Sequence, residues 1–118
     1  MAKKKSLSVS ISITPNSFTT IFKRFRGEKP ELDLSGVSDL RKLLSNEKAK
    51  VIYTIKNENP ESIYNLSKLL KRDFKSVSED IKVLKKFGVI ELEKAVKGKR
   101  KMLKPVLAID SLNITFEV

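Results

Sequence analysis

The 118-residue sequence contains neither cysteine nor histidine. Without cysteine there can be no disulfide scaffold, thiolate nucleophile or zinc finger. Without histidine there is no imidazole general base, so a Ser-His-Asp site is excluded. The four glycines are scattered and form no phosphate-cradling loop. We therefore expect no metal and no cofactor.

Few groups remain that could perform catalysis. Glu79 and Asp80 are adjacent carboxylates, but on a helix their side chains would diverge by about 100°. A salt-bridged surface is the more natural interpretation of this pair than acid/base chemistry. We expect a protein that is not an enzyme.

Long hydrophobic runs are also missing, since none approaches the ~18 apolar residues of a membrane span. The start "MAKKKSLSVSISIT" is basic, but its apolar positions alternate with Ser, which is not typical of a signal peptide. We expect a cytoplasmic protein without membrane association. Its 40% hydrophobic and 33% charged residues indicate a globular chain, and its length fits one domain.

Basic residues are abundant, with 25 Lys and Arg against 14 Asp and Glu, a net charge of +11. Residues 68–104 hold 13 basic and five acidic residues, which accounts for +8 of this charge. Residues 105–118 hold two acidic residues and no basic one. A local positive field of this kind indicates a polyanionic partner, nucleic acid first and an acidic membrane surface second.

The N-terminal part predicts a strand followed by two short helices. "LSVSISI" at residues 7–13 alternates with a period of two, which is typical of a half-buried strand. Asn16 or Ser17 as cap and Gly27 as stop bound a predicted helix, whose apolar residues are Phe18, Ile21, Phe22 and Phe25. "ELDLSG" predicts a brief strand or an extended link. "VSDLRKLLS" predicts a short helix whose inward residues are Leu40, Leu43 and Leu44.

A more regular helical pattern begins at residue 45. Ser45 or Asn46 caps a helix to about Lys56, which "NENP" ends. Its predicted apolar stripe is Ala49, Ile52 and Tyr53, flanked by Val51 and Ile55. Ser62 caps a second helix, whose apolar residues are Ile63, Leu66, Leu69 and Leu70.

After the short connection "KRD", a third helix is predicted from about Phe74 to Phe87. Its buried face consists of Val77, Ile81, Leu84 and Phe87. Gly88 stands where a left-handed C-cap is expected. "VIELEKA" and "MLKPVLA" then alternate as the strands of a hairpin around Gly98, and "LNITFEV" predicts a closing strand.

The order of helix, helix, tight turn, helix and basic hairpin predicts an α+β fold of the winged helix-turn-helix class over residues 45–108. Residues 1–44 form an N-terminal extension of strand and helix, which we expect to mediate dimerisation. Residues 109–118 form a C-terminal strand. The two terminal strands could pair with each other or with those of a second chain.

The predicted DNA-binding residues lie on the third helix, the hairpin and the start of the second helix. The third helix offers cations and short hydroxyls to a major groove: Lys75, Ser76, Ser78, Glu79 and Lys82. The hairpin tip offers cations to the backbone or the minor groove: Lys97, Lys99, Arg100 and Lys101. Ser62 and Tyr64 complete the set, although Tyr64 could instead pack on a neighbour. Taken singly, such residues also occur on solvated faces and ordinary turns, and it is their combined order that indicates DNA binding.

The segment "ESIYNLSKLLKRDFKSVSEDIKVLKKFGVIE" resembles the winged-helix core of MarR-like and related prokaryotic regulators. Over most of the chain, the terminal strands included, the sequence resembles a small family of predicted transcriptional regulators, some regarded as antitoxin-like. The resemblance implies that Lys75, Ser76, Ser78, Glu79 and Lys82 lie on a recognition helix, on which Asp80 is structural. It also implies that Arg100 and its neighbours form the wing, which is longer and richer in Lys than is typical.

Together these features predict a sequence-specific regulator that binds double-stranded DNA and acts as a homodimeric repressor. The alternatives are an antitoxin that also binds a toxin, an architectural chromatin protein without sequence preference, and a winged helix that binds proteins.

Overall fold

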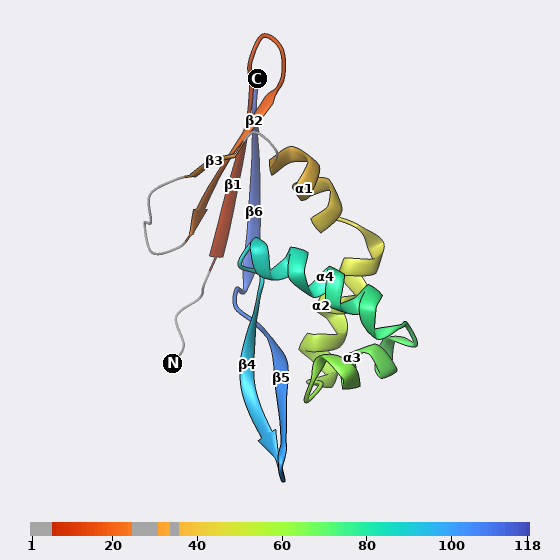
Figure 1. Ribbon diagram of the computed structural model, residues 1–118. Helices are drawn as coiled ribbons and strands as arrows, with labels where there is room; N and C mark the ends of the chain where they lie inside the picture. Colours follow the sequence, from red (N-terminus) through yellow and green to blue (C-terminus); the bar gives the residue numbers. More distant parts are fainter. Residues whose placement is uncertain (1–5, 25–30, 34–35) are drawn as a thin grey trace. The chain divides into compact units, whose positions relative to one another are not determined.

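A computed structural model describes residues 6–24, 31–33 and 36–118. The described residues form a mixed α+β structure in the order β1-β2-β3-α1-α2-α3-α4-β4-β5-β6 (Figure 1). The chain divides into two compact units. Unit 1 comprises Met1–Lys42 and Ile109–Val118, and unit 2 comprises Leu43–Ala108.

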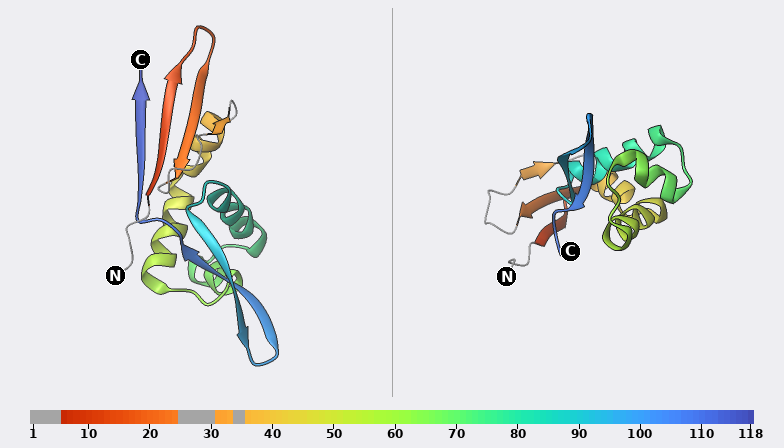
Figure 2. Two further views of the ribbon diagram at one scale, coloured as in Figure 1. Left: turned by 90° about the vertical axis from the view of Figure 1, so that its left-hand side faces the viewer. Right: turned by 90° about the horizontal axis from the view of Figure 1, so that it is seen from below.

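Unit 1 contains a four-stranded sheet in the order β3-β2-β1-β6. Its strands are β1 (Ser6–Ile13), β2 (Phe18–Arg24), β3 (Glu31–Asp33) and β6 (Ser111–Glu117). β1 pairs antiparallel with β2 on one side and parallel with β6 on the other (Figure 2). The predicted first and last strands are confirmed, and they pair within one chain.

The helix predicted around residues 16–27 is wrong, because Phe18–Arg24 is strand β2. The backbone N–H of Thr14 donates to the Ser17 carbonyl at 2.8 Å, and this turn reverses the chain so that Phe18 lies opposite Ile13. β-Branched and aromatic residues favour the strand, and β1 offers a full edge with which it pairs. Thr20 is fully buried in this sheet. Phe25 and Gly27 lie outside the described residues.

The short helix predicted before residue 45 is confirmed as α1 (Gly36–Leu43). Leu40 and Leu43 are buried as expected, but Leu44 is 58% exposed. Leu44 departs from the prediction because the helix ends one residue before it, so its side chain no longer follows the helical face. Of the two alternatives for "ELDLSG", the brief strand is the one observed, as β3 at Glu31–Asp33.

Unit 2 begins with three helices that share one capping arrangement. They are α2 (Asn46–Glu58), α3 (Ile63–Leu70) and α4 (Phe74–Lys86). Each begins after a residue whose side-chain oxygen accepts a hydrogen bond from the N–H three residues on. These caps are Ser45, Ser62 and Asp73, with N···O distances of 3.3, 2.9 and 3.0 Å.

The predicted buried face of α4 is confirmed, since Val77, Ile81 and Leu84 are at most 2% exposed and Phe87 is buried. The predicted stripe of α2 is wrong: Ala49 and Tyr53 are exposed, and Val51 and Ile55 are the buried apolar residues. α2 is rotated in this way because the same inward face carries Lys48, which has a buried ionic partner in α4. In α3, Leu66 is buried, whereas Leu69 is 44% exposed.

Four residues with a left-handed backbone shape the connections of unit 2. Asn59 (φ 48°) follows α2, Lys71 (φ 56°) follows α3, Gly88 (φ 78°) follows α4, and Gly98 (φ 63°) reverses the hairpin. The hairpin consists of β4 (Ile90–Lys97) and β5 (Arg100–Leu107), with Lys97 paired to Arg100. A glycine with positive φ at the first position of a two-residue loop is typical of a type II′ turn. The predicted hairpin is confirmed.

No helix within residues 6–24, 31–33 and 36–118 is both long and apolar enough to cross a membrane. The same described ranges hold no group of three or more acidic residues arranged to bind a metal ion.

The strained residue in the α3–α4 connection leads to a stability prediction. A left-handed backbone costs a non-glycine residue about 1–2 kcal/mol of conformational free energy. Glycine avoids this cost, but part of the gain is lost because glycine makes the unfolded state more flexible. We expect Lys71→Gly to raise the free energy of unfolding by about 0.5–1 kcal/mol. Urea denaturation measures the change, and Lys71→Ala, which keeps the strain, is the matched control. A loss of stability in Lys71→Gly would contradict the expectation.

Candidate functional site

A buried ionic cluster connects three segments of unit 2. The carboxylate of Asp80 accepts from Lys48 Nζ at 3.1 Å through Oδ1 and from Arg72 Nη1 at 2.8 Å through Oδ2. The side chains of Asp80, Lys48 and Arg72 are 13, 11 and 24% exposed. The cluster therefore joins α4 to α2 and to the connection between α3 and α4.

The connection is held at a second point by Arg72. Its Nη2 donates to Ser76 Oγ at 2.6 Å, while the Ser76 N–H donates to the capping carboxylate of Asp73. Because one guanidinium contacts both Asp80 and Ser76, one turn apart on α4, the start of this helix has a defined rotation about its axis. Predicted as a DNA-binding residue, Ser76 is engaged in this network.

The rotation of α4 turns a mixed but mainly basic face to solvent. Asp80, Val77, Ile81 and Leu84 of α4 are buried. On the accessible side, exposed residues follow at spacings of four, three and four: Lys75, Glu79, Lys82 and Lys86. Ser78 is half-buried beside this line. The predicted residues Lys75, Glu79 and Lys82 thus share one accessible face, which we call the α4 face.

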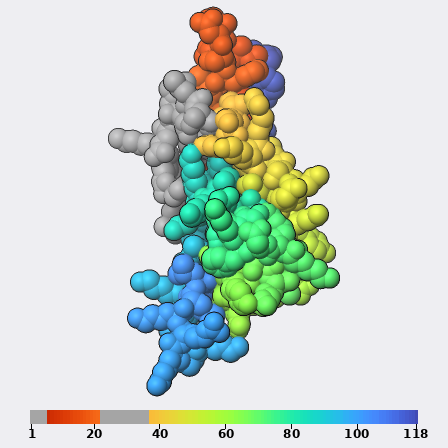
Figure 3. All heavy atoms as spheres, turned by 45° about the vertical axis from the view of Figure 1, so that its right-hand side comes forward, coloured from red at the N-terminus to blue at the C-terminus, as the bar shows by residue number. Residues whose placement is uncertain are grey.

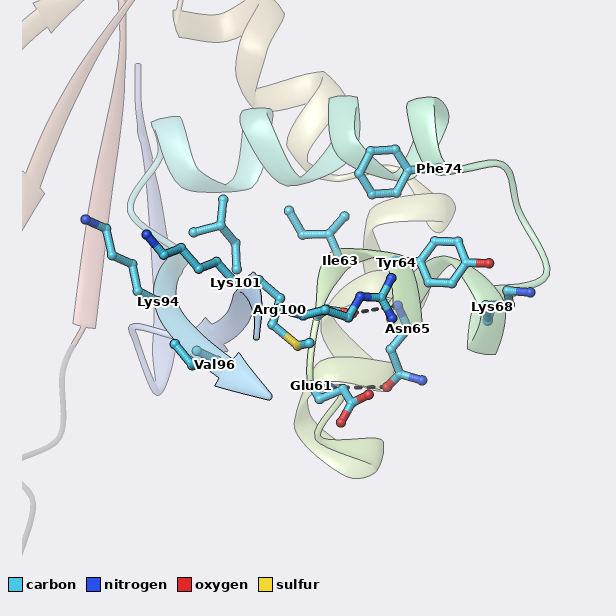
Figure 4. A pocket seen from close by; sticks show the side chains of 14 residues that line it. Glu61, Ile63, Tyr64, Asn65, Lys68, Phe74, Lys94, Val96, Arg100 and Lys101 are labelled. Atoms are coloured by element: carbon cyan, nitrogen blue, oxygen red, sulfur yellow. Dashed lines mark hydrogen bonds between the residues drawn. The ribbon is translucent and has the colours of Figure 1, made fainter. Parts of the chain in front are cut away.

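A groove of about 870 Å³ lies between α3, the first residue of α4 and the β4–β5 hairpin (Figure 4). Its lining includes four of the predicted residues, Ser62, Tyr64, Arg100 and Lys101. Figure 3 shows the hairpin, in blue, projecting beyond α3 and α4, in green. We call this feature the hairpin groove.

The hairpin groove combines exposed aromatic rings with cations. Tyr64 and Phe74 are 55 and 50% exposed, and Lys68 Nζ lies 5.1 Å from the centre of the Tyr64 ring. This distance is within the range of a cation–π contact. Across the groove, the Arg100 side chain extends toward Asn65 on α3 (Figure 4).

The lining residues that the sequence did not predict include two lysines and an aromatic residue, Lys68, Lys94 and Phe74. Lys68 could have been found, because it follows Tyr64 by four residues on a predicted helix and so shares its face. Lys94 reaches the groove through the hairpin register, in which it pairs with Leu103. Sequence spacing alone does not specify that register.

Besides Ser76, two further predicted residues make contacts within the chain. Ser62 is only 9% exposed, and its hydroxyl accepts the Asn65 N–H as the cap of α3. Lys97 Nζ lies 3.4 Å from Glu61 Oε2, with both side chains more than half exposed, so the pair connects the hairpin weakly to the start of α3. Lys99 is exposed in the turn.

The chemistry of these surfaces suits a polyanion with flat apolar parts. Aromatic rings can stack on bases or sugars, and Lys and Arg can contact phosphates. Among the residues that line the hairpin groove, Glu61 is the single carboxylate, and Lys97 neutralises it. This lining offers binding groups rather than an acid and base placed to act together.

A family model described as HVO_A0114 matches residues 43–114, more than half of the chain. The chain therefore belongs to the HVO_A0114 family. The matched segment begins where unit 2 begins and extends into β6. No curated protein matches the chain. The family name states no activity.

The ionic cluster predicts a large effect of a conservative change. Asp80→Asn leaves Lys48 and Arg72 without a countercharge in a largely buried site, and removing one partner of such a cluster costs about 3–5 kcal/mol. We expect a loss of this size in the free energy of unfolding, measured by urea denaturation.

The neighbouring carboxylate supplies the matched control. Glu79→Gln removes the same charge from an exposed position of α4, and we expect a change within about 0.5 kcal/mol. If the two substitutions change the free energy of unfolding equally, the buried cluster stabilises the protein no more than an exposed carboxylate does.

Proposed function

We propose that this chain is a winged helix-turn-helix protein that binds double-stranded DNA and regulates transcription, acting as a repressor. The order of elements in unit 2 supports this class: α2, α3, a three-residue connection, α4 and a basic hairpin. In such domains the third helix enters the major groove, and the hairpin, or wing, contacts the flanking backbone. In this chain those parts are α4 and β4–β5.

The observation that carries the proposal is that one compact unit presents both basic surfaces. The α4 face carries Lys75 and Lys82, and the hairpin carries Lys99, Arg100 and Lys101. The exposure of these cations matters because counterions released from DNA phosphates supply much of the binding free energy.

The two surfaces would contact different parts of the DNA. Lys75 and Lys82 are long enough to contact phosphates or guanine, and the half-buried Ser78 is short enough to approach a base edge. Glu79 lies between the two lysines and can accept from a cytosine amino group. The hairpin groove would hold a flanking backbone, with cations on the phosphates and Tyr64 and Phe74 against the sugars.

Repression then requires no chemistry of the chain itself. A winged domain whose recognition helix occupies a major groove at a promoter excludes polymerase from that DNA. An architectural protein would share the phosphate contacts but lack base-edge contacts, so the two roles differ in sequence preference.

Fluorescence anisotropy with two duplexes of equal length tests the proposal. One is the segment upstream of the protein's own gene and the other a scrambled version, both titrated across roughly 50–300 mM salt. A preference of about 100-fold or more for the upstream duplex is expected of an autoregulating repressor. Equal, steeply salt-dependent binding would indicate the architectural role. Absence of binding to both would contradict DNA binding and favour a protein partner.

The salt dependence of single variants tests the contacts. Removing one Lys or Arg that contacts a phosphate should reduce the magnitude of the negative slope of log K against log salt by about one. We expect this reduction of the salt slope for Lys82→Ala on the α4 face and for Lys99→Ala and Arg100→Ala on the hairpin. Lys50→Ala, an exposed lysine of α2 outside both surfaces, is the control and should leave the slope unchanged. If Lys99→Ala and Arg100→Ala change neither affinity nor slope, the hairpin does not contact DNA.

A further inference from the structure

The outer edge of unit 1 is a strand without the usual protection against pairing. β6 pairs with β1 on one side only and is the last strand of the described sheet. Its seven residues include no Lys, Pro or Gly, the residues by which edge strands commonly avoid pairing. In an edge strand, alternate N–H and C=O groups point away from the sheet and can bond to another strand.

β6 also carries apolar side chains that its own chain does not cover. In the parallel register Leu112, Ile114 and Phe116 lie beside Leu7, Val9 and Ile11 on one face of the sheet. Leu7 and Val9 are 2 and 1% exposed, whereas Ile114 and Phe116 are 42 and 57% exposed.

The exposed residues form one patch at the end of the sheet. Phe116 packs edge-to-face against Phe18 of β2 with ring centroids 5.7 Å apart, although Phe18 is itself 46% exposed. Ile13, at the end of the strand between them, is 51% exposed. Three neighbouring strands thus contribute large apolar side chains to the same accessible region.

We propose that the edge of β6 binds β6 of a second copy of this chain, antiparallel about a two-fold axis at Ile114, so that two four-stranded sheets become one. This inference assigns an interface that the proposed DNA binding does not require. It agrees in part with the homodimer expected from the sequence, but it places the contact on the C-terminal strand.

Self-complementarity identifies a second copy as the partner. With Ile114 opposite its own counterpart, Leu112 lies opposite Phe116, Asn113 opposite Thr115 and Ser111 opposite Glu117, so apolar meets apolar and polar meets polar. A register shifted by one residue would place every apolar side chain opposite a polar one. A two-fold interface requires that one surface match itself in this way.

Charge supports the same partner. The chain carries a net charge of +11, so two copies repel each other as whole molecules. Residues 105–118 contain no basic residue, and the proposed register places no like charges directly opposite each other. This edge is where two copies can meet with little repulsion, and it offers no cation to a nucleic acid.

The mass of the protein in solution without DNA tests the interface. We expect analytical ultracentrifugation at micromolar concentration to give twice the chain mass of 13.4 kDa. Ile114→Lys and Ile114→Glu each place like charges opposite each other at the axis. Each should raise the dimer dissociation constant at least about 100-fold, and an equimolar mixture of the two should regain the dimer mass. Tyr53→Lys, which replaces a 70% exposed side chain in unit 2, should remain dimeric.

The absence of cysteine allows a second, independent test. Directly opposed residues of antiparallel strands have Cβ atoms about 4.5–5.5 Å apart, close enough for a disulfide after small adjustment. Ile114→Cys should therefore form a covalent dimer on mild oxidation, whereas Tyr53→Cys should not.

Three results would overturn the interface: a wild-type protein of single-chain mass, an Ile114→Lys variant that stays dimeric, or a mixture of the charged variants that stays monomeric. These experiments contain no DNA. Failure of the interface thus leaves the anisotropy experiment unaffected, and failure of DNA binding leaves the mass measurement unaffected.

Discussion

Unit 2 depends on the buried carboxylate of Asp80, which must meet Lys48 and Arg72 at the same time. Removing three charges from water is costly, and mutual attraction offsets that cost only when the geometry of all three is satisfied. α2, the α3–α4 connection and α4 are therefore constrained together. The rotation of α4 that points Asp80 inward also turns Lys75 and Lys82 to solvent, so the internal ion pairs determine which residues the proposed DNA-binding face presents.

The two units separate two kinds of surface chemistry. Unit 2 carries basic side chains on α4 and the hairpin, together with the exposed rings of Tyr64 and Phe74. The β6 edge in unit 1 has no basic residue and presents backbone groups and apolar side chains. The two proposals fit this division, because phosphate contacts require cations, whereas the proposed self-association is favoured where cations are absent.

Much of the fold follows from local sequence patterns. The strands β1 and β6, the helices α1 to α4 and the hairpin were all predicted, because periodicity, caps and left-handed glycines act within a few residues. The inward face of α4 was also predicted, since its apolar residues follow one helical stripe. At the candidate site, the exposed positions of Lys75, Glu79 and Lys82 followed from that same stripe.

What the sequence by itself determined is therefore the type of most elements, their order and the distribution of charge along the chain. The tertiary structure decided the rest. Phe18–Arg24 became a strand because β1 offered an edge, and α2 turned Lys48 inward because Asp80 lies 32 residues further along the chain. The hairpin groove likewise joins Tyr64 and Arg100 from separate elements. These outcomes depend on contacts between distant segments, whose free energies outweigh local preference and leave no periodic signal in the sequence.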